Sequence, residues 1–373
     1  MLNIKRNESC YCGSGKKYKN CCFLRDNYNE NLPSDALNKL KDEFLNYNQK
    51  DLLKKISALQ LCSENHSQNI RLETASRIAS SCHNKESKEI SINQLKNLFL
   101  KYLPYEGSIG IQEDPTNCLF TYNIQFDGGN YVTFSGGCYS ENFILQNILN
   151  VIFFEEEFSE DFKNYIRMIS LAILKLSDEI ASTSSISRYA TSEDRWRKDI
   201  VFPKEEKFNV LKESVSFSKD KINQIYRIYG LDHKVLDFFC FDSKEDSFEN
   251  INTDLNPLFV KPIMKIDDEY IVTIPSALIY ALKYWILFSL DNYNYKDLFI
   301  EKYKSYSMYK IEKSFRKLFF RDYEYEFPNN IHNLPIGERL FSFDTDKLAY
   351  LIFVNDSLEN YEKNHPFNFK TFK

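Results

Sequence analysis

The sequence predicts an α+β protein that is mainly helical, and three observations support this prediction. Apolar residues recur at spacings of three and four over most of the 373 residues, which is typical of amphipathic helices. Alternating β-rich runs occur around a glycine-containing stretch near residue 120 and again in the last third. Four of the nine cysteines lie close together near residue 10. We therefore expect a small N-terminal cysteine module, a helical body with a β-hairpin and a mixed α/β C-terminal region.

The order of these patterns divides the chain into four predicted segments. Residues 1–25 form the cysteine module, 34–140 a helical block with the hairpin, 141–255 a second helical block, and 256–373 the mixed α/β region. A chain of 373 residues is long enough for two or three domains with cores of their own. An apolar content of 43% is that of ordinary globular proteins and excludes wholesale disorder.

The hairpin is the clearest β-structure in the pattern. Helical spacing extends from Leu37 to Leu103, and the alternating runs Cys118–Phe126 and Tyr131–Phe134 then flank the turn sequence Asp-Gly-Gly-Asn. Helical spacing resumes after the hairpin and is broken near Pro203 and Gly230.

The C-terminal segment alternates between strand and helix patterns. Two short strands are predicted first, then an apolar helix and a second long helix, and finally two strands that flank a turn-rich stretch carrying Glu338. In chain order, these predictions cover Pro257–Thr273 for the strand pair, Ala277–Leu290 and Lys296–Phe320 for the helices, and Tyr323–Phe327 and Leu348–Val354 for the last strands.

Membrane insertion and secretion are not predicted. The longest apolar stretch, Ala277–Leu290, is interrupted by Lys283 and is shorter than the roughly 20 residues that span a bilayer, so we expect a buried core helix. The first residues, MLNIKRNES, contain no apolar core of a secretory signal. We therefore expect a cytoplasmic protein, in which thiols stay reduced and clustered cysteines bind metal rather than form disulfides.

The net charge restricts the kind of nucleic-acid contact that the chain could make. A formal charge of −5 at pH 7 is unlike that of a protein that coats nucleic acid, which would be basic. Any contact with nucleic acid therefore has to come from a local basic patch.

The cysteine cluster has the composition of a zinc site. Its pattern is C-x-C-x8-C-C, and four thiolates suit the tetrahedral coordination of Zn²⁺. The intervening Gly13–Gly15 run supplies a turn whose backbone amides can face the sulfur atoms. The flanking side chains are mostly basic and give a net charge of +5, or about +3 once the four thiolates and the metal are included; the charged residues are Lys5, Arg6, Glu8, Lys16, Lys17, Lys19 and Arg25.

Residues 5–22 resemble the SEC-C motif, the short zinc-binding tail of the SecA translocation ATPase that also occurs on many unrelated bacterial proteins. The resemblance rests on Arg6-Asn7 and on the run Cys12–Lys19, and it implies a structural zinc held by Cys10, Cys12, Cys21 and Cys22. Departures from the usual motif are confined to residues that are not ligands: Glu8, Ser9, Tyr11 and Phe23.

The resemblance also implies a function in recognition. The SecA tail contacts a chaperone and the ribosome, so the expected partner is a protein or an RNA that docks on the basic zinc module. Four protein ligands leave no open position on the metal, which favours a structural over a catalytic zinc and a protein that is not an enzyme. A phosphate-binding loop at Gly13–Lys17 is disfavoured, because the first glycine is absent and Lys17 occupies the Ser/Thr position.

An alternative is a Mg²⁺-dependent nuclease or a phage-defence protein, for which DNA is also a candidate partner. The C-terminal segment resembles a restriction-endonuclease-like domain, in which Glu312 would be the helix acid and Asp346 the strand acid that bind Mg²⁺. No Asp/Glu-x-Lys follows Glu338, so the resemblance implies a degenerate or incomplete domain.

Three further hypotheses come from smaller patterns. Cys62 and His66, together with Cys82-His83, form a candidate second metal site, although buried free cysteines are common. A basic and aromatic cluster at 188–198 is diluted by acidic residues and is favoured as a solvated helix end. The helical middle of the chain is a candidate oligomerisation or scaffold domain.

Overall fold

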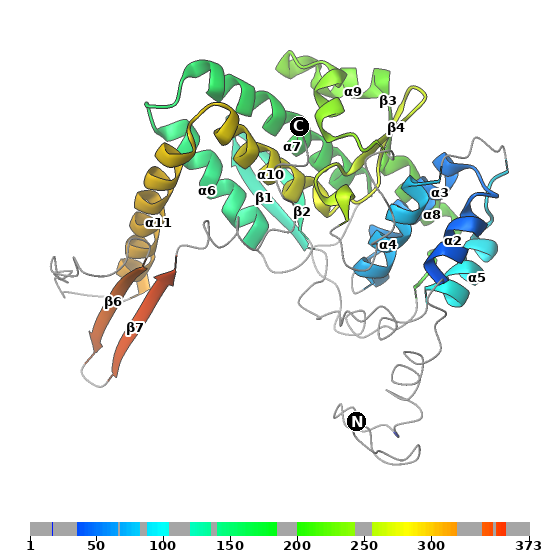
Figure 1. Ribbon diagram of the computed structural model, residues 1–373, viewed down its shortest axis with the longest axis horizontal. Coiled ribbons are helices and arrows are strands. Elements are labelled where there is room, and N and C mark those ends of the chain that lie inside the picture. The colour runs from blue at the N-terminus through cyan, green and yellow to red at the C-terminus, as the bar shows by residue number, and fades with distance from the viewer. Residues whose placement is uncertain are drawn as a thin grey trace. The chain divides into compact units, whose positions relative to one another are not determined.

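The computed structural model describes residues 17, 36–65, 68–82, 88–103, 120–135, 140–184, 200–242, 256–318, 338–345 and 348–355. Within these ranges the chain is mainly helical, with antiparallel sheets of two, three and two strands (Figure 1), so the predicted fold class is confirmed. The chain forms two compact units, Met1–Phe143 with Asn164–Trp285 and Ile144–Lys163 with Ile286–Lys373. The division into four segments stays a prediction.

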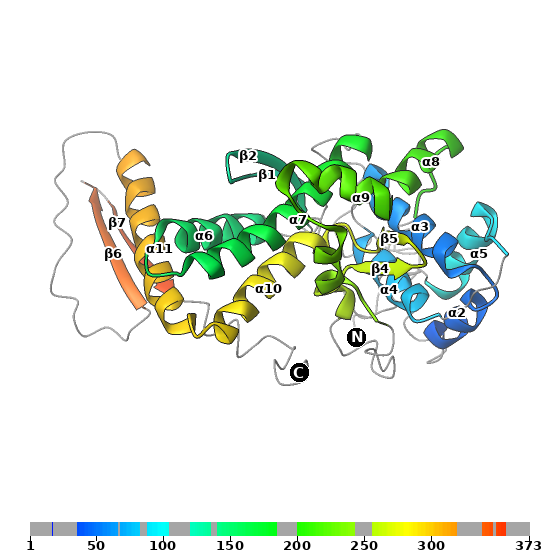
Figure 2. The same ribbon diagram turned by 90° about the horizontal axis from the view of Figure 1, so that it is seen from above.

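The first unit begins with the helices that the apolar spacing predicts. They gather at one end of that unit, as Figure 2 shows, and their apolar residues form a shared core in which Leu40, Leu53, Leu72 and Leu95 are fully buried. The four helices are α2 (Ala36–Phe44), α3 (Gln49–Gln60), α4 (Asn69–Ser80) and α5 (Ile92–Tyr102).

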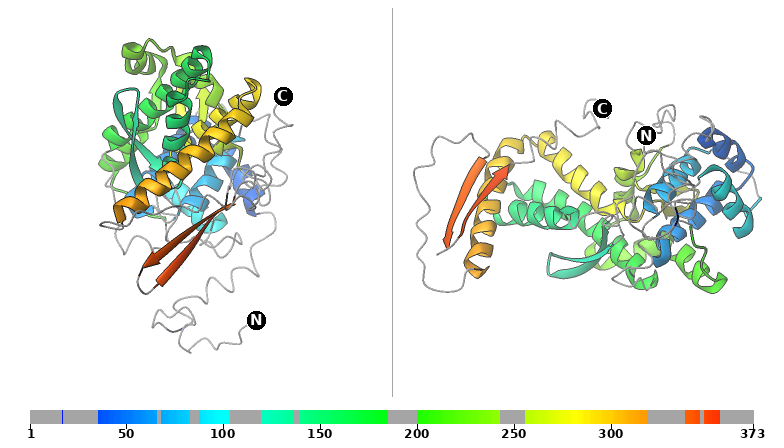
Figure 3. Two further views of the ribbon diagram at one scale, coloured as in Figure 1. Left: turned by 90° about the vertical axis from the view of Figure 1, so that its left-hand side faces the viewer. Right: turned by 90° about the horizontal axis from the view of Figure 1, so that it is seen from below.

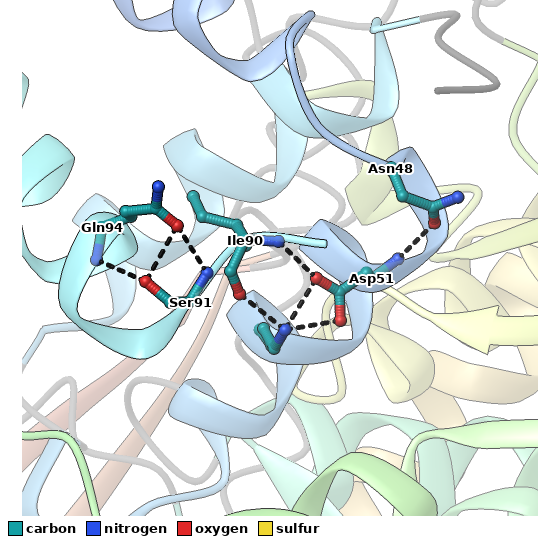
Figure 4. A network of polar contacts seen from close by, with 6 residues as sticks. Asn48, Asp51, Ile90, Ser91 and Gln94 are labelled. Carbon is teal, nitrogen blue, oxygen red and sulfur yellow. Dashed lines mark hydrogen bonds and ion pairs between the residues drawn. The ribbon is translucent and has the colours of Figure 1, made fainter. Parts of the chain in front are cut away.

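A polar network joins α3 to the segment that leads into α5 (Figure 4). The Asp51 carboxylate accepts hydrogen bonds from the Ile90 amide at 2.9 Å and from the Lys55 ammonium at 2.7 Å. The same ammonium donates to the Ile90 carbonyl at 2.7 Å. Ser91 and Gln94 form a capping box at the start of α5, which satisfies amides that the first turn leaves open. These contacts fix the entry of α5 against α3.

A three-stranded sheet combines distant parts of the chain. Its strands are β3 (Ser216–Ser218), β4 (Ile263–Ile266) and β5 (Glu269–Val272), in the order β3-β5-β4. The β4–β5 pair confirms the prediction for Pro257–Thr273, and Asp267 at the turn has a positive φ of 55°. We did not predict β3, because three residues are too few to show an alternating pattern.

Buried polar side chains of α3 and α4 contact the end of β5. Ser57 donates to the Val272 carbonyl at 2.5 Å, while Gln60 and Ser76 donate to the Thr273 carbonyl at 2.8 Å and 3.0 Å. The donors are separated from their acceptors by about 200 residues of sequence. Their hydrogen bonds satisfy backbone oxygens that would otherwise be buried without partners.

The predicted hairpin is confirmed as β1 (Phe120–Phe126) and β2 (Gly129–Ser135). Its turn is shorter than the sequence predicted, because Asp127 and Gly128 alone occupy the loop, with φ values of 48° and 75°. Positive φ at both central residues is the requirement of a type I′ turn, for which Asp-Gly is a preferred pair. On β2 a Cβ at Gly129 would lie 2.5 Å from the Tyr131 hydroxyl, so this position favours glycine.

Four further helices follow the hairpin, and both α6 and α7 contact it: the Thr133 hydroxyl on β2 donates to Asn142 on α6 at 2.7 Å. The Asp178 carboxylate accepts a hydrogen bond from the Val132 amide at 3.1 Å, and Arg167 lies 3.4 Å from Asp127. The predicted break at Gly230 is present, with φ of 66°. The helices are α6 (Ser140–Phe154), α7 (Glu160–Ser184), α8 (Glu205–Ser214) and α9 (Lys219–Tyr226), and short 3₁₀ turns cover Arg227–Tyr229 and His233–Phe239.

The C-terminal region contains the two predicted helices, α10 (Ala277–Asn292) and α11 (Lys296–Leu318). None of the helices in the described ranges is long and apolar enough to cross a membrane. The last hairpin, β6 (Glu338–Thr345) and β7 (Leu348–Asn355), is drawn in red and orange in Figure 3. Glu338 begins a strand, so its prediction in a turn was wrong: β6 pairs with β7, which supplies hydrogen bonds that the local sequence does not reveal. The predicted strand Tyr323–Phe327 lies outside the described residues.

Candidate functional site

The four predicted zinc ligands, Cys10, Cys12, Cys21 and Cys22, lie outside the described residues. Of the module the structure describes Lys17, whose side chain is exposed. The donor set nevertheless fits zinc chemically, since four cysteine sulfurs complete a tetrahedral shell without water or carboxylate. The cysteines would hold the ion as thiolates, and nearby lysines would offset the resulting negative charge.

Glu312 and Asp346, the two candidate nuclease carboxylates, are 34 residues apart in the sequence. Glu312 falls in the last two turns of α11, and nothing is described of its side chain. Asp346 lies outside the described residues, between β6 and β7, whose register closes with Thr345 opposite Leu348. A Mg²⁺ site formed by Glu312 and Asp346 therefore stays a prediction from the sequence.

The thiols of Cys62 and Cys82 are buried, and their raised pKa values favour the protonated form. The Cys62 thiol donates to the Glu64 carboxylate, with 2.9 Å between sulfur and oxygen, and burial raises its pKa to about 12. Cys82 donates to the Ile78 carbonyl at 3.2 Å, and burial likewise raises its pKa to about 12. Zinc binds thiolate rather than thiol, so these environments oppose metal binding.

The proposed second metal site is therefore not assembled by the part that is described. His66 and His83 both lie outside it. Among the residues whose placement is described, no group of three or more His, Cys, Asp or Glu side chains could hold a metal ion.

Glu64 instead belongs to a structural contact between distant segments. Burial opposes the charge of this carboxylate, but hydrogen bonds from Cys62 and Ser63 lower its pKa to about 2, and Lys207 lies 3.3 Å away. The neighbouring Asn65 side chain is fully buried and exchanges hydrogen bonds of 2.7 Å and 2.8 Å with the backbone of Val201. These contacts hold the segment before α8 against the turn after α3.

A second ionised carboxylate connects α3 to the three-stranded sheet. Glu269, at the start of β5, is 18% exposed and forms ion pairs with Lys50 and Lys54, the latter at 2.7 Å. It also accepts a hydrogen bond from Ser216 on β3. Partial burial opposes its charge, yet these three donors lower the pKa of the Glu269 carboxyl to about 2.

Glu73 on α4 has the opposite environment. Burial raises the pKa of its carboxyl to about 7, and the Ser276 hydroxyl, 3.4 Å away at the start of α10, offsets this only in part. Asn256 donates to the Glu73 carbonyl at 3.2 Å, so the segment before the sheet also packs here. We did not predict an unusual environment for Glu73. The available signal was its position three residues before Ser76, which is fully buried, because residues at this spacing lie on the same face of a helix.

The comparison with protein-family models identifies one segment of the chain. Residues 6–24 match the SEC-C motif. The matched residues include all four clustered cysteines and the lysines between them, which confirms the resemblance found over residues 5–22. Neither a curated protein nor a solved structure matches the chain.

Proposed function

Since residues 6–24 carry a SEC-C motif, we propose that this protein is a zinc-binding recognition protein that docks a protein or RNA partner through this N-terminal module. The observation that carries the proposal is the match itself, which spans Cys10, Cys12, Cys21 and Cys22. Four sulfur ligands saturate the metal, so its role is to fix the fold of a short segment that has too few residues for a core of its own.

The charge of the module supports docking as its task. A rigid segment of net positive charge, about +3 with the metal included, offers ammonium and guanidinium donors to an acidic partner surface or to phosphates. The described Lys17 is exposed, as such a contact requires. We place the protein in the bacterial cytoplasm, where the thiols stay reduced and available to zinc.

The chemistry of the body supports a stoichiometry of one zinc per chain. Cys62, Cys82 and Cys240 each have a pKa raised to about 12 by burial, and they are far less available as thiolates than cysteines in a short basic segment. Zinc supplied during folding should therefore select the clustered cysteines.

Elemental analysis of the purified chain tests the metal site directly. We expect one zinc per chain in the native protein and none in the Cys21→Ala/Cys22→Ala variant, because two of the four ligands are removed. A matched control, Cys62→Ala/Cys82→Ala, removes two cysteines from the body and should keep its zinc. Native protein without zinc would overturn the metal assignment.

Capture of partners tests the recognition function separately. Immobilised native protein should retain a set of bound proteins or RNAs that the Cys21→Ala/Cys22→Ala variant loses and the Cys62→Ala/Cys82→Ala variant keeps. Identical capture by all three proteins would overturn docking through the module even if the zinc were present.

A further inference from the structure

We draw no further inference here: the strongest candidate, the surface patch at the C-terminal end of α6 where Phe154 is 76% exposed beside the acidic side chains among residues 155–161, carries nothing, because an acidic cluster beside one exposed ring does not define a ligand and nothing in the described part of the chain shows what covers it.

Discussion

The cysteines of the N-terminal module and Cys62 and Cys82 of the helical body differ in the sequence that surrounds them. The clustered four lie in a short, basic segment that has no room for an apolar core. Cys62 and Cys82 are fully buried among the core helices, and burial raises their pKa values to about 12. Burial of Cys62 and Cys82 therefore favours the thiol over the thiolate that a metal would bind.

Two glutamates of the first unit also show how the surroundings of a group set its pKa, here for a carboxyl group. Glu269 has two ammonium donors and a hydroxyl close by, and its pKa falls to about 2. Glu73 is partly buried with one hydroxyl close by, and desolvation raises its pKa to about 7. The charged state is stabilised at the sheet and destabilised at α4, so the two acids make opposite contributions to stability at neutral pH.

Alkylation with iodoacetamide should show the largest difference between the two groups of cysteines. A thiol pKa of about 12, against about 8.5 for a free cysteine, lowers the thiolate fraction at pH 7.5 by roughly three orders of magnitude. After zinc is removed with a chelator, mass spectrometry should find the clustered cysteines modified first, with Cys62, Cys82 and Cys240 unmodified over the same period. In urea all should react at similar rates. Equal rates in the folded protein would contradict the contrast.

Replacement of Glu269 should break the ion pairs between the sheet and α3. Glu269→Gln should lower the free energy of unfolding at pH 7 by about 1–3 kcal/mol, reduced from the full pKa shift because Lys50 and Lys54 are partly exposed to solvent. The folded pKa is depressed, so this stabilisation is present above about pH 4.5 and is lost as the pH falls towards 2. Urea titrations at pH 7 and pH 3 measure the effect. A difference between the proteins that did not shrink at pH 3 would argue against an electrostatic origin.

Replacement of Glu73 should change the free energy of unfolding in the opposite direction from replacement of Glu269, and by a smaller amount. Its folded pKa is raised, so its ionisation costs stability as the pH rises from about 4.5 to about 7, and the full cost is present above that range. Glu73→Gln should therefore raise the free energy of unfolding at pH 8 by about 1–2 kcal/mol and leave it nearly unchanged at pH 4. Ser276→Ala serves as the control for the loss of the single hydrogen bond. A lower free energy of unfolding for Glu73→Gln at pH 8 would contradict this prediction, because it would show that the folded protein stabilises the Glu73 carboxylate.

Local features of the chain were readable from the sequence because their signals lie within a few residues. The SEC-C motif depends on four cysteines within one short segment, and the family match to residues 6–24 confirms that resemblance. Zinc binding by these cysteines stays a prediction. Asp127-Gly128 specified the first hairpin, since few other pairs accept positive φ at both positions. The periodicity of apolar residues predicted helices in the regions of α2 to α5, α6 to α9, α10 and α11 for the same reason, because a helix repeats its pattern every 3.6 residues. Between the hairpin and residue 239 it gave one broad helical stretch with breaks near Pro203 and Gly230, and it did not separate the individual helices.

Only the tertiary structure decided which distant groups meet. Those contacts in turn decide the pKa values of the buried and partly buried carboxyl groups. β3 is a strand because Ser216–Ser218 pairs with β5, some 50 residues further along the chain. Glu269 is strongly acidic because α3 brings Lys50 and Lys54 to it, whereas desolvation raises the pKa of Glu73 to about 7, with the Ser276 hydroxyl 3.4 Å away. A sequence states the type and order of these residues. Their pKa values depend on solvent exclusion and on neighbours about 200 residues away, which exist only once the chain has folded.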